Sequence, residues 1–202
     1  MNGSDTRMKY IISGTNRPGS RTLVLSRYVQ KLYKEAGEDV GLIDLSEVGL
    51  ELLGAATEYG DKVPPVMQGW IDKINAADGL IVVCPEYNGS MPGALKYFID
   101  HWKYPDSYEY RPIALIGLGG RFGALRPVEH LQGVFGYRNA FIYPERVFIT
   151  DVFRVLDADG NLTDARLATL LRSQTVGFQA FTRALAGAGI DANSRLKKAQ
   201  IK

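Results

Sequence analysis

Five short runs of apolar residues alternate with longer amphipathic segments along the chain. The runs cover residues 8–13, 39–45, 79–84, 112–120 and 139–143, and residues 79–84 (GLIVVC) are apolar at nearly every position. A continuous apolar run predicts a strand that is buried on both faces, as in a parallel sheet.

The segments between these runs carry apolar residues at helical spacing. Leu25, Val29, Leu32 and Ala36 fall on one face of a helix, and Gly37 is a suitable stop. Further helices are predicted over residues 66–77, 95–102 and 124–135, and a last helix, capped by Thr163, is predicted to run through residue 185. Residues 147–155 are expected to be extended, and the tail from residue 187 is expected to fray.

This alternation predicts an α/β fold, with a doubly wound, five-stranded parallel sheet and helices on both faces. No internal repeat or linker is visible, so we expect one domain over residues 1–202, with a flexible polar leader (1–7) and a flexible tail (187–202). In such folds ligands bind beyond the carboxyl ends of the strands. Three loops with glycine or turn chemistry leave those ends, at residues 14–22, 85–92 and 117–123, and their convergence predicts a single site.

Composition excludes several classes of protein. The net charge of +2 over 202 residues is too small for a nucleic-acid-binding surface, and one cysteine cannot form a disulfide framework. Two histidines and one cysteine give no metal-ligand spacing, so no metal site is expected. No apolar run approaches the ~20 residues of a membrane span, and the leader lacks the apolar region of a secretory signal, so we expect a cytoplasmic protein that does not engage membranes.

The first loop, ISGTNRPGSRT (residues 12–22), has the character of a phosphate-binding loop. Gly14 and Gly19 have the spacing of a P-loop, but Ser20 and Arg21 replace its Lys and Ser/Thr. Because the loop enters a helix N-terminus, it favours an anion such as a single terminal phosphate. The groups available to that phosphate are the hydroxyls of Ser13, Thr15, Ser20 and Thr22 and the guanidinium of Arg17. The alternative is that Ser20 only caps the helix and residues 18–19 only form a turn.

The second loop and the segment after it, CPEYNGSMPGALKYFIDHW (residues 84–102), closely resemble the signature of the NADPH-dependent FMN reductase family. That family has a flavodoxin-like fold and includes quinone, chromate and azo-dye reductases. The first loop is similar to the family's Ser-Gly-Ser-x-Arg-x-x-Ser-x-Asn, with Thr15 and Thr22 in place of Ser and Asn, and GLGGRFGALRP (residues 117–127) is similar to its third loop. The resemblance spans roughly residues 8–186. It departs at Tyr97-Phe98, where Asn-Ala is frequent, and at an inserted His101.

The resemblance implies an FMN-dependent NAD(P)H oxidoreductase. NADPH or NADH would pass a hydride to bound FMN, and a small acceptor (a quinone, flavin, chromate or azo compound) would be reduced in a ping-pong sequence. The flavin carries the chemistry, so no catalytic side chain is expected. The residues implied to bind the cofactor are Ser13, Thr15, Arg17, Ser20, Thr22, Pro85, Glu86, Tyr87, Asn88, Gly89, Ser90, Gly119 and Gly120.

Several alternatives remain open at the second loop. A turn at Gly89 can bring backbone N–H groups close to the flavin edge, or Tyr87 and Asn88 can belong to a self-supporting turn. Glu86 can pair with an arginine across a subunit contact instead of touching flavin. Cys84 is expected to be inert core, and the lone His101 and His130 are expected to lie on the surface or in packing rather than to act as acids or bases.

The segment after the second loop is rich in aromatic residues. The aromatic residues of KYFIDHWKYPDSYEY (residues 96–110) are too many for one helix face to bury, which predicts a homodimer or homotetramer. They are Tyr97, Phe98, Trp102, Tyr104, Tyr108 and Tyr110.

The alternative function is a flavodoxin-type electron carrier, or an FMN-binding module without its own nicotinamide reaction. Such carriers are usually strongly acidic, so the charge of +2 favours the enzyme.

Overall fold

The computed structural model describes residues 8–49, 51, 63–157 and 159–200, and in this part of the chain the strands form one parallel sheet. The strands are β1 (Tyr10–Ser13), β2 (Gly41–Asp44), β3 (Leu80–Pro85), β4 (Pro112–Leu118), β5 (Phe141–Ile142) and β6 (Val147–Ile149). Their order is β2-β1-β3-β4-β5, with β6 also beside β4. This is the strand order of a flavodoxin-like sheet, as the sequence predicts.

Two short strands share the edge of the sheet where one strand is predicted. β5 pairs with residues 112–113 of β4, and β6 pairs with residues 116–118 further along the same strand. The predicted extended segment over residues 147–155 is therefore only partly right. Its first residues form β6, but Asp151 has a left-handed backbone (φ 49°) that turns the chain into the short helix α6 (Val152–Val155).

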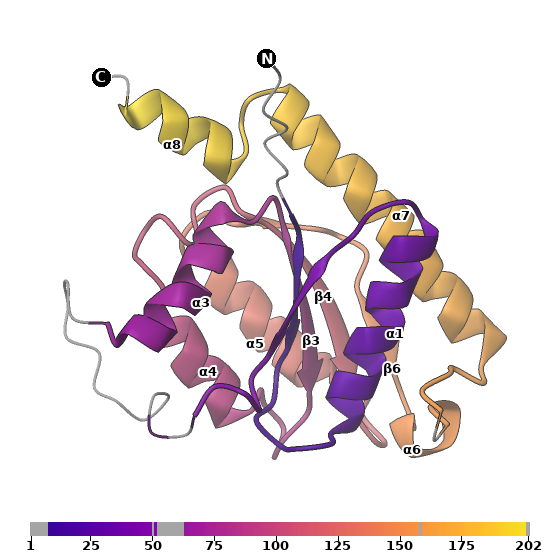
Figure 1. Ribbon diagram of the computed structural model, residues 1–202. Coiled ribbons are helices and arrows are strands. Elements are labelled where there is room, and N and C mark those ends of the chain that lie inside the picture. Colours follow the sequence, from indigo (N-terminus) through magenta and orange to yellow (C-terminus); the bar gives the residue numbers. More distant parts are fainter. Residues whose placement is uncertain (1–7, 50, 52–62, 158, 201–202) are drawn as a thin grey trace.

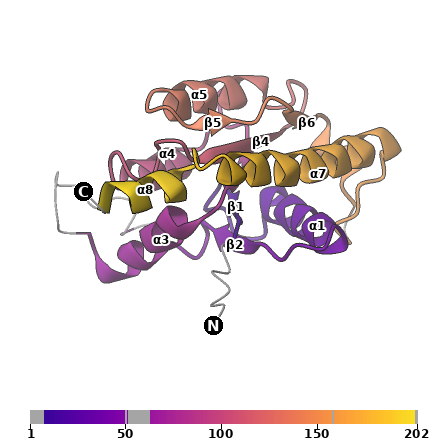
Figure 2. The same cartoon turned by 90° about the horizontal axis from the view of Figure 1, so that it is seen from above.

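Helices cover both faces of the sheet, as predicted (Figures 1 and 2). Figure 2 shows α1 (Arg21–Glu35) and α7 (Ala165–Gly187) on one face, and α3 (Pro65–Ala76), α4 (Gly93–Asp100) and α5 (Leu125–Gly136) on the other. Two apolar clusters result, one on each side of the central strands. In the described residues no helix is both long and apolar enough to cross a bilayer.

The last long helix begins one residue later than predicted, with Asp164 and not Thr163 as its N-cap. The Asp164 Oδ1 accepts hydrogen bonds from the backbone N–H groups of Arg166 (2.8 Å) and Leu167 (3.0 Å). The backbone N–H of Thr163 instead donates to the carbonyl of Val155 at 2.9 Å. Thr163 therefore belongs to the turn that follows α6, because its backbone and hydroxyl are both directed back to that helix.

The predicted fraying of the tail is wrong for the described residues, because Ala192–Gln200 form helix α8. The backbone N–H of Ala192 donates to the carbonyl of Tyr110 at 3.0 Å, and the Asn193 side chain donates to the carbonyl of Ala77 at 3.1 Å. The fully buried Arg111 guanidinium also donates to the carbonyl of Ala77. The bonds of Ala192 and Asn193 hold α8 against the amino-terminal edge of the sheet, opposite the three loops (Figure 1). The predicted leader (1–7) lies outside the described residues.

Candidate functional site

The first loop lies directly against the end of β3. The backbone N–H of Gly14 donates to the carbonyl of Val83 at 2.9 Å, and a Cβ on Gly14 would lie 2.7 Å from that oxygen. Only glycine allows this approach, because a real Cβ does not come so close. Beside it, the Oγ of Ser13 is fully buried and has no hydrogen-bond partner within the described structure. A buried hydroxyl without a partner is unusual, and it fits a site that a polar ligand completes.

The hydroxyls predicted for phosphate binding differ in their surroundings. The Oγ of Ser20 accepts a hydrogen bond from the backbone N–H of Leu23 at 3.1 Å, so Ser20 is the N-cap of α1, as the alternative interpretation requires. Thr22 is buried in the first turn of the same helix. Arg17 is exposed, and its guanidinium lies 4.7 Å from the centre of the Tyr87 ring. The first loop therefore offers a helix N-terminus and one exposed cation beside the second loop.

The second loop is a tight hairpin. Tyr87 and Ser90 exchange two backbone hydrogen bonds of 2.9 and 3.1 Å. Asn88 and Gly89 between them both have positive φ (52° and 78°), which defines a type I′ turn. A Cβ on Gly89 would meet nothing closer than 3.9 Å, so the backbone conformation and not crowding calls for glycine here. The hairpin supports itself, as one of the two interpretations predicts.

Side chains fasten this hairpin to its neighbours. The hydroxyl of Tyr87 and the Oγ1 of Thr15 are hydrogen-bonded at 2.9 Å, which joins the second loop to the first. The Oγ of Ser90 and the Nδ1 of His130 on α5 are hydrogen-bonded at 2.9 Å. His130 thus contacts the loop, a role that its sequence surroundings do not reveal.

Glu86 joins the second loop to the third. Its backbone N–H donates to the carbonyl of Leu118 at 3.1 Å, and its Oε2 accepts from the backbone N–H of Ala124 at 3.0 Å. Its Oε1 lies 3.9 Å from Arg126 of the same chain. Glu86 is therefore near an arginine of its own chain, Arg126, whereas the sequence suggests an arginine across a subunit contact. The sequence does not predict the roles of Ala124 and Arg126. Alanine rarely adopts a left-handed backbone, and nothing near Arg126 in the sequence indicates a contact with Glu86.

The third loop is built from close backbone contacts. The N–H of Gly119 donates to the carbonyl of Ile149 at 3.1 Å, and the carbonyl of Gly120 accepts from Gly123 (3.3 Å) and Asp151 (3.1 Å). A Cβ on Gly119 would lie 3.3 Å from the backbone nitrogen of Ala124, inside the space that Glu86 bridges. The three loops therefore meet at the carboxyl edge of β1, β3 and β4, as the sequence predicts.

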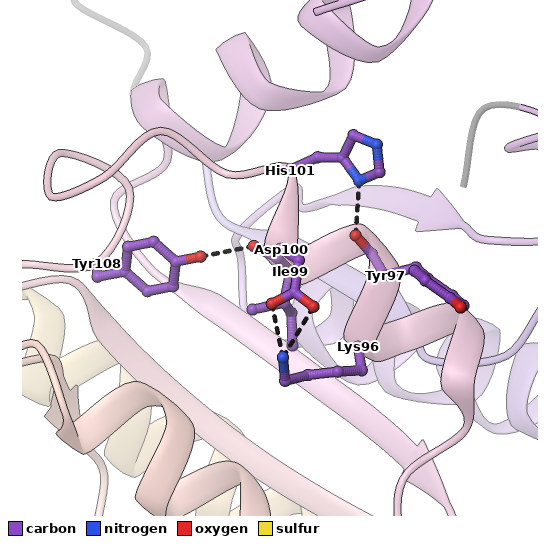
Figure 3. A network of polar contacts seen from close by, with 6 residues as sticks. All are labelled: Lys96, Tyr97, Ile99, Asp100, His101 and Tyr108. Atoms are coloured by element: carbon purple, nitrogen blue, oxygen red, sulfur yellow. Dashed lines mark hydrogen bonds and ion pairs between the residues drawn. The ribbon is translucent and has the colours of Figure 1, made fainter. Parts of the chain in front are cut away.

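The segment where the family resemblance breaks has a structural role. Figure 3 shows the His101 ring directed at the carbonyl of Tyr97, with Nδ1 at 2.7 Å, and the ammonium of Lys96 between the two carboxylate oxygens of Asp100. In the same view the Tyr108 hydroxyl donates to the carbonyl of Ile99. These bonds close the end of α4, and His101 is buried, so of the two places expected for it, surface or packing, it takes the second.

The predicted excess of aromatic residues is partly absorbed by the core. Phe98 and Trp102 are buried, and Trp102 stacks on Phe135 at 5.8 Å. Tyr97 and Tyr104 are each 57% exposed. Two of the six residues are therefore exposed, and Tyr108 and Tyr110 are partly buried.

The charge of the site favours an anion. The exposed arginines at this edge lie over aromatic rings: Arg17 over Tyr87 (4.7 Å), Arg21 over Phe153 (4.5 Å) and Arg126 over Phe122 (5.3 Å). The described residues contain no group of three or more His, Cys, Asp or Glu side chains that could hold a metal.

Cys84 ends β3 and is fully buried, and burial raises the pKa of its thiol. The thiol is therefore uncharged and enclosed, which confirms the expected core role. Taken together, the orphaned Ser13 hydroxyl, the α1 N-terminus, the exposed cations and the rigid hairpin fit a flat ligand that carries one phosphate, as FMN does.

Comparisons with known proteins agree with this geometry. The family model described as NADPH-dependent FMN reductase matches residues 10–154. The NADPH:quinone oxidoreductase of Arabidopsis thaliana is 32% identical over 183 residues, which cover 87% of this chain and 92% of the relative. The FMN-dependent NADPH-azoreductase of Staphylococcus aureus is 30% identical over 175 residues, which cover 83% and 93%. A solved structure of the flavoenzyme NAD(P)H:(acceptor) oxidoreductase of Paracoccus denitrificans has the same fold, with a TM-score of 0.69, 24% identity and coverage of 89% and 98%.

Proposed function

The chain belongs to the NADPH-dependent FMN reductase family, and we propose that it is an FMN-dependent NAD(P)H oxidoreductase that reduces a small acceptor. The observation that carries this proposal is the meeting of three loops at the carboxyl edge of β1, β3 and β4, with the buried, unpartnered hydroxyl of Ser13 at the end of β1. In flavodoxin-like sheets FMN binds at the switch point between β1 and β3. The relatives that reduce quinones and azo compounds support those acceptor classes, and flavins and chromate are further candidates.

We assign the phosphate of FMN to the first loop. The Ser13 hydroxyl, the N-terminal N–H groups of α1 and the Arg17 guanidinium supply donors and positive charge there. Thr15 and Thr22 line the same loop, and Ser20 contributes through its capping of α1. We propose that these groups hold the phosphate without a metal.

We assign the flavin ring to the space beside the hairpin and the third loop. When bound, FMN supplies the chemistry, accepting a hydride equivalent from the nicotinamide and giving electrons to the acceptor. The turn at residues 88–89 holds backbone N–H groups in fixed positions where they can stabilise negative charge. Glu86 keeps the hairpin and the third loop, with Gly119 and Gly120, at a constant separation.

No side chain of the described site is assigned as a proton donor. His130 is engaged by Ser90, and Cys84 is buried. Exchange of nicotinamide for acceptor at a single open site would give the ping-pong sequence. We further propose a single domain and a cytoplasmic homodimer or homotetramer, in which the exposed Tyr97 and Tyr104 contribute to the interface.

The proposal is tested with the purified, desalted protein. We expect a flavin absorption spectrum after reconstitution with FMN, and steady-state oxidation of NADPH or NADH with at least one acceptor among a quinone, an azo dye, chromate and riboflavin. FMN binding without nicotinamide oxidation in the presence of any of these acceptors would instead indicate an electron carrier or a binding module.

A further inference from the structure

A hollow lies outside the three loops, between β6, α6 and the start of α7. It is a cleft of about 640 Å³. Three arginines line it: Arg146 beside β6, Arg154 on α6 and Arg166 in the first turn of α7. The cleft is open to solvent, and its volume leaves room for part of a small molecule. The proposed FMN site uses none of these residues.

The cleft adjoins the proposed flavin site through the backbone. Thr150 and Asp151, which line the cleft, directly follow β6. The N–H of Asp151 donates to the carbonyl of Gly120 at 3.1 Å, and a Cβ on Gly123 would lie 2.5 Å from the Thr150 methyl. Two residues that line the cleft, Thr150 and Asp151, are therefore in direct contact with the third loop, which joins the cleft to the edge of the sheet where the three loops meet.

The cleft carries a net positive charge, and its arginines can bind a ligand. Two carboxylates, Asp151 and Asp164, line it together with the three guanidinium groups, and Asp164 is already used to cap α7. Arg146 donates to the Gln132 side chain at 2.9 Å. Within the part of the chain that the structure describes, none of the three arginines has a carboxylate at ion-pair distance. Guanidinium groups with free donors bind phosphate well, because their planar fork matches two of its oxygens.

The cleft also has apolar lining. Phe148, Val155 and Leu167 supply an aromatic ring and two aliphatic side chains beside the arginines. The combination suits a ligand with a flat ring and a phosphate on a sugar, and not a free inorganic anion. The sequence offers no G-x-G-x-x-G loop after β1 that would hold a dinucleotide in another manner.

We propose that this cleft binds the adenosine 2′-phosphate end of NADPH and makes the enzyme prefer NADPH to NADH. The inference rests on the proposed function, because it assigns one end of the reductant whose other end must reach the flavin. NADPH and NADH differ only in the 2′-phosphate, which lies across the pyrophosphate from the nicotinamide. When the nicotinamide contacts the flavin, the 2′-phosphate must therefore bind beside the flavin site and not inside it.

The test compares the FMN-loaded wild type with Arg154→Ala and Arg166→Ala, and with Arg183→Ala, an exposed arginine of α7 outside the cleft, as the control. Loss of one charged hydrogen bond lowers affinity roughly tenfold or more. We therefore expect the KM for NADPH to rise about tenfold in each cleft variant, with a much smaller change for NADH. Arg154→Lys should restore part of the preference, and Arg183→Ala should change neither KM.

Binding of adenosine 2′,5′-bisphosphate and of AMP to the holoenzyme, by calorimetry, gives a second readout that does not depend on turnover. The wild type should bind the bisphosphate more tightly than AMP, and the cleft variants should lose that difference. Equal changes for NADPH and NADH, unchanged KM values in folded variants, or bisphosphate binding that survives both substitutions would overturn the proposal. A holoenzyme that oxidises neither nicotinamide but retains arginine-dependent bisphosphate binding would reject the proposed function and leave the cleft assignment standing.

Discussion

Removing the carboxylate of Glu86 should loosen the third loop and weaken FMN binding. Glu86 accepts a hydrogen bond from the backbone N–H of Ala124, a fully buried residue with a left-handed backbone (φ 64°). That conformation is unfavourable for alanine by about 1–2 kcal/mol, so the contact with Glu86 helps to hold it. Glu86→Ala leaves the buried N–H without an acceptor.

The expected size of the effect follows from these contacts. An unsatisfied buried N–H costs about 1–3 kcal/mol. The ion pair adds little, because Arg126 is 59% exposed and 3.9 Å away, and exposed pairs contribute about 0–1 kcal/mol. We therefore expect Glu86→Ala to lower the free energy of unfolding by about 1–4 kcal/mol. Glu86→Gln keeps an oxygen that can accept from Ala124 and should lose about 1 kcal/mol or less.

Chemical denaturation of the two variants measures this difference directly, and fluorescence titration with FMN measures its consequence for the site. Glu86→Ala should bind FMN more weakly, and Glu86→Gln should stay close to the wild type. If both variants lost the same stability and affinity, the charge and not the hydrogen bond to Ala124 would be the important feature, and the argument for a bridge between the loops would fail.

Three further predictions concern single residues. Gly89→Val places a β-branched residue at φ 78°, which should cost about 1–3 kcal/mol of strain and lower FMN occupancy. An FMN titration like that of the wild type would show that the hairpin lies away from the flavin. Arg17→Ala should weaken FMN about tenfold but leave riboflavin unchanged, because only FMN carries the phosphate, and equal losses for both ligands would remove the phosphate assignment. Cys84 should not react with a thiol reagent in the native protein at pH 8 but should react once in denaturant, since burial raises its pKa. Because the thiol is protonated in the folded state and ionises above about pH 8.5 when unfolded, its contribution to stability should fall as pH rises beyond that value, which denaturation at several pH values can measure.

The sequence predicts the parts of this protein that depend on local pattern. The apolar run of β3 is buried at every position, and the turn that the sequence predicts at Gly89 is present. Its type I′ geometry is a finding of the structure, and it suits the Asn-Gly pair because few other residues accept two positive φ values in succession. The meeting of the three loops also follows from alternation alone, because parallel strands share one carboxyl edge.

The features that the sequence does not reveal depend on contacts between distant residues. Helix α8 has a polar sequence with no clear apolar face, and it is held by a hydrogen bond from the Asn193 side chain to the carbonyl of Ala77 and by one from Arg111 to the Asn193 side chain. The same is true of Glu86, whose partner Ala124 lies 38 positions away. The left-handed Asp151 that turns β6 into α6 is hydrogen-bonded to Gly120, and no local pattern marks that contact.

Anaerobic addition of NADPH to the FMN-loaded protein, followed by rapid-mixing absorbance and then by addition of a quinone, tests the central claim most directly. We predict that the visible flavin absorbance is lost in a single-turnover reaction and returns when the quinone is added, and that Gly89→Val slows the first phase. Persistent oxidised flavin in the presence of NADPH and NADH, with FMN tightly bound, would contradict the account and identify the protein as an FMN-binding carrier.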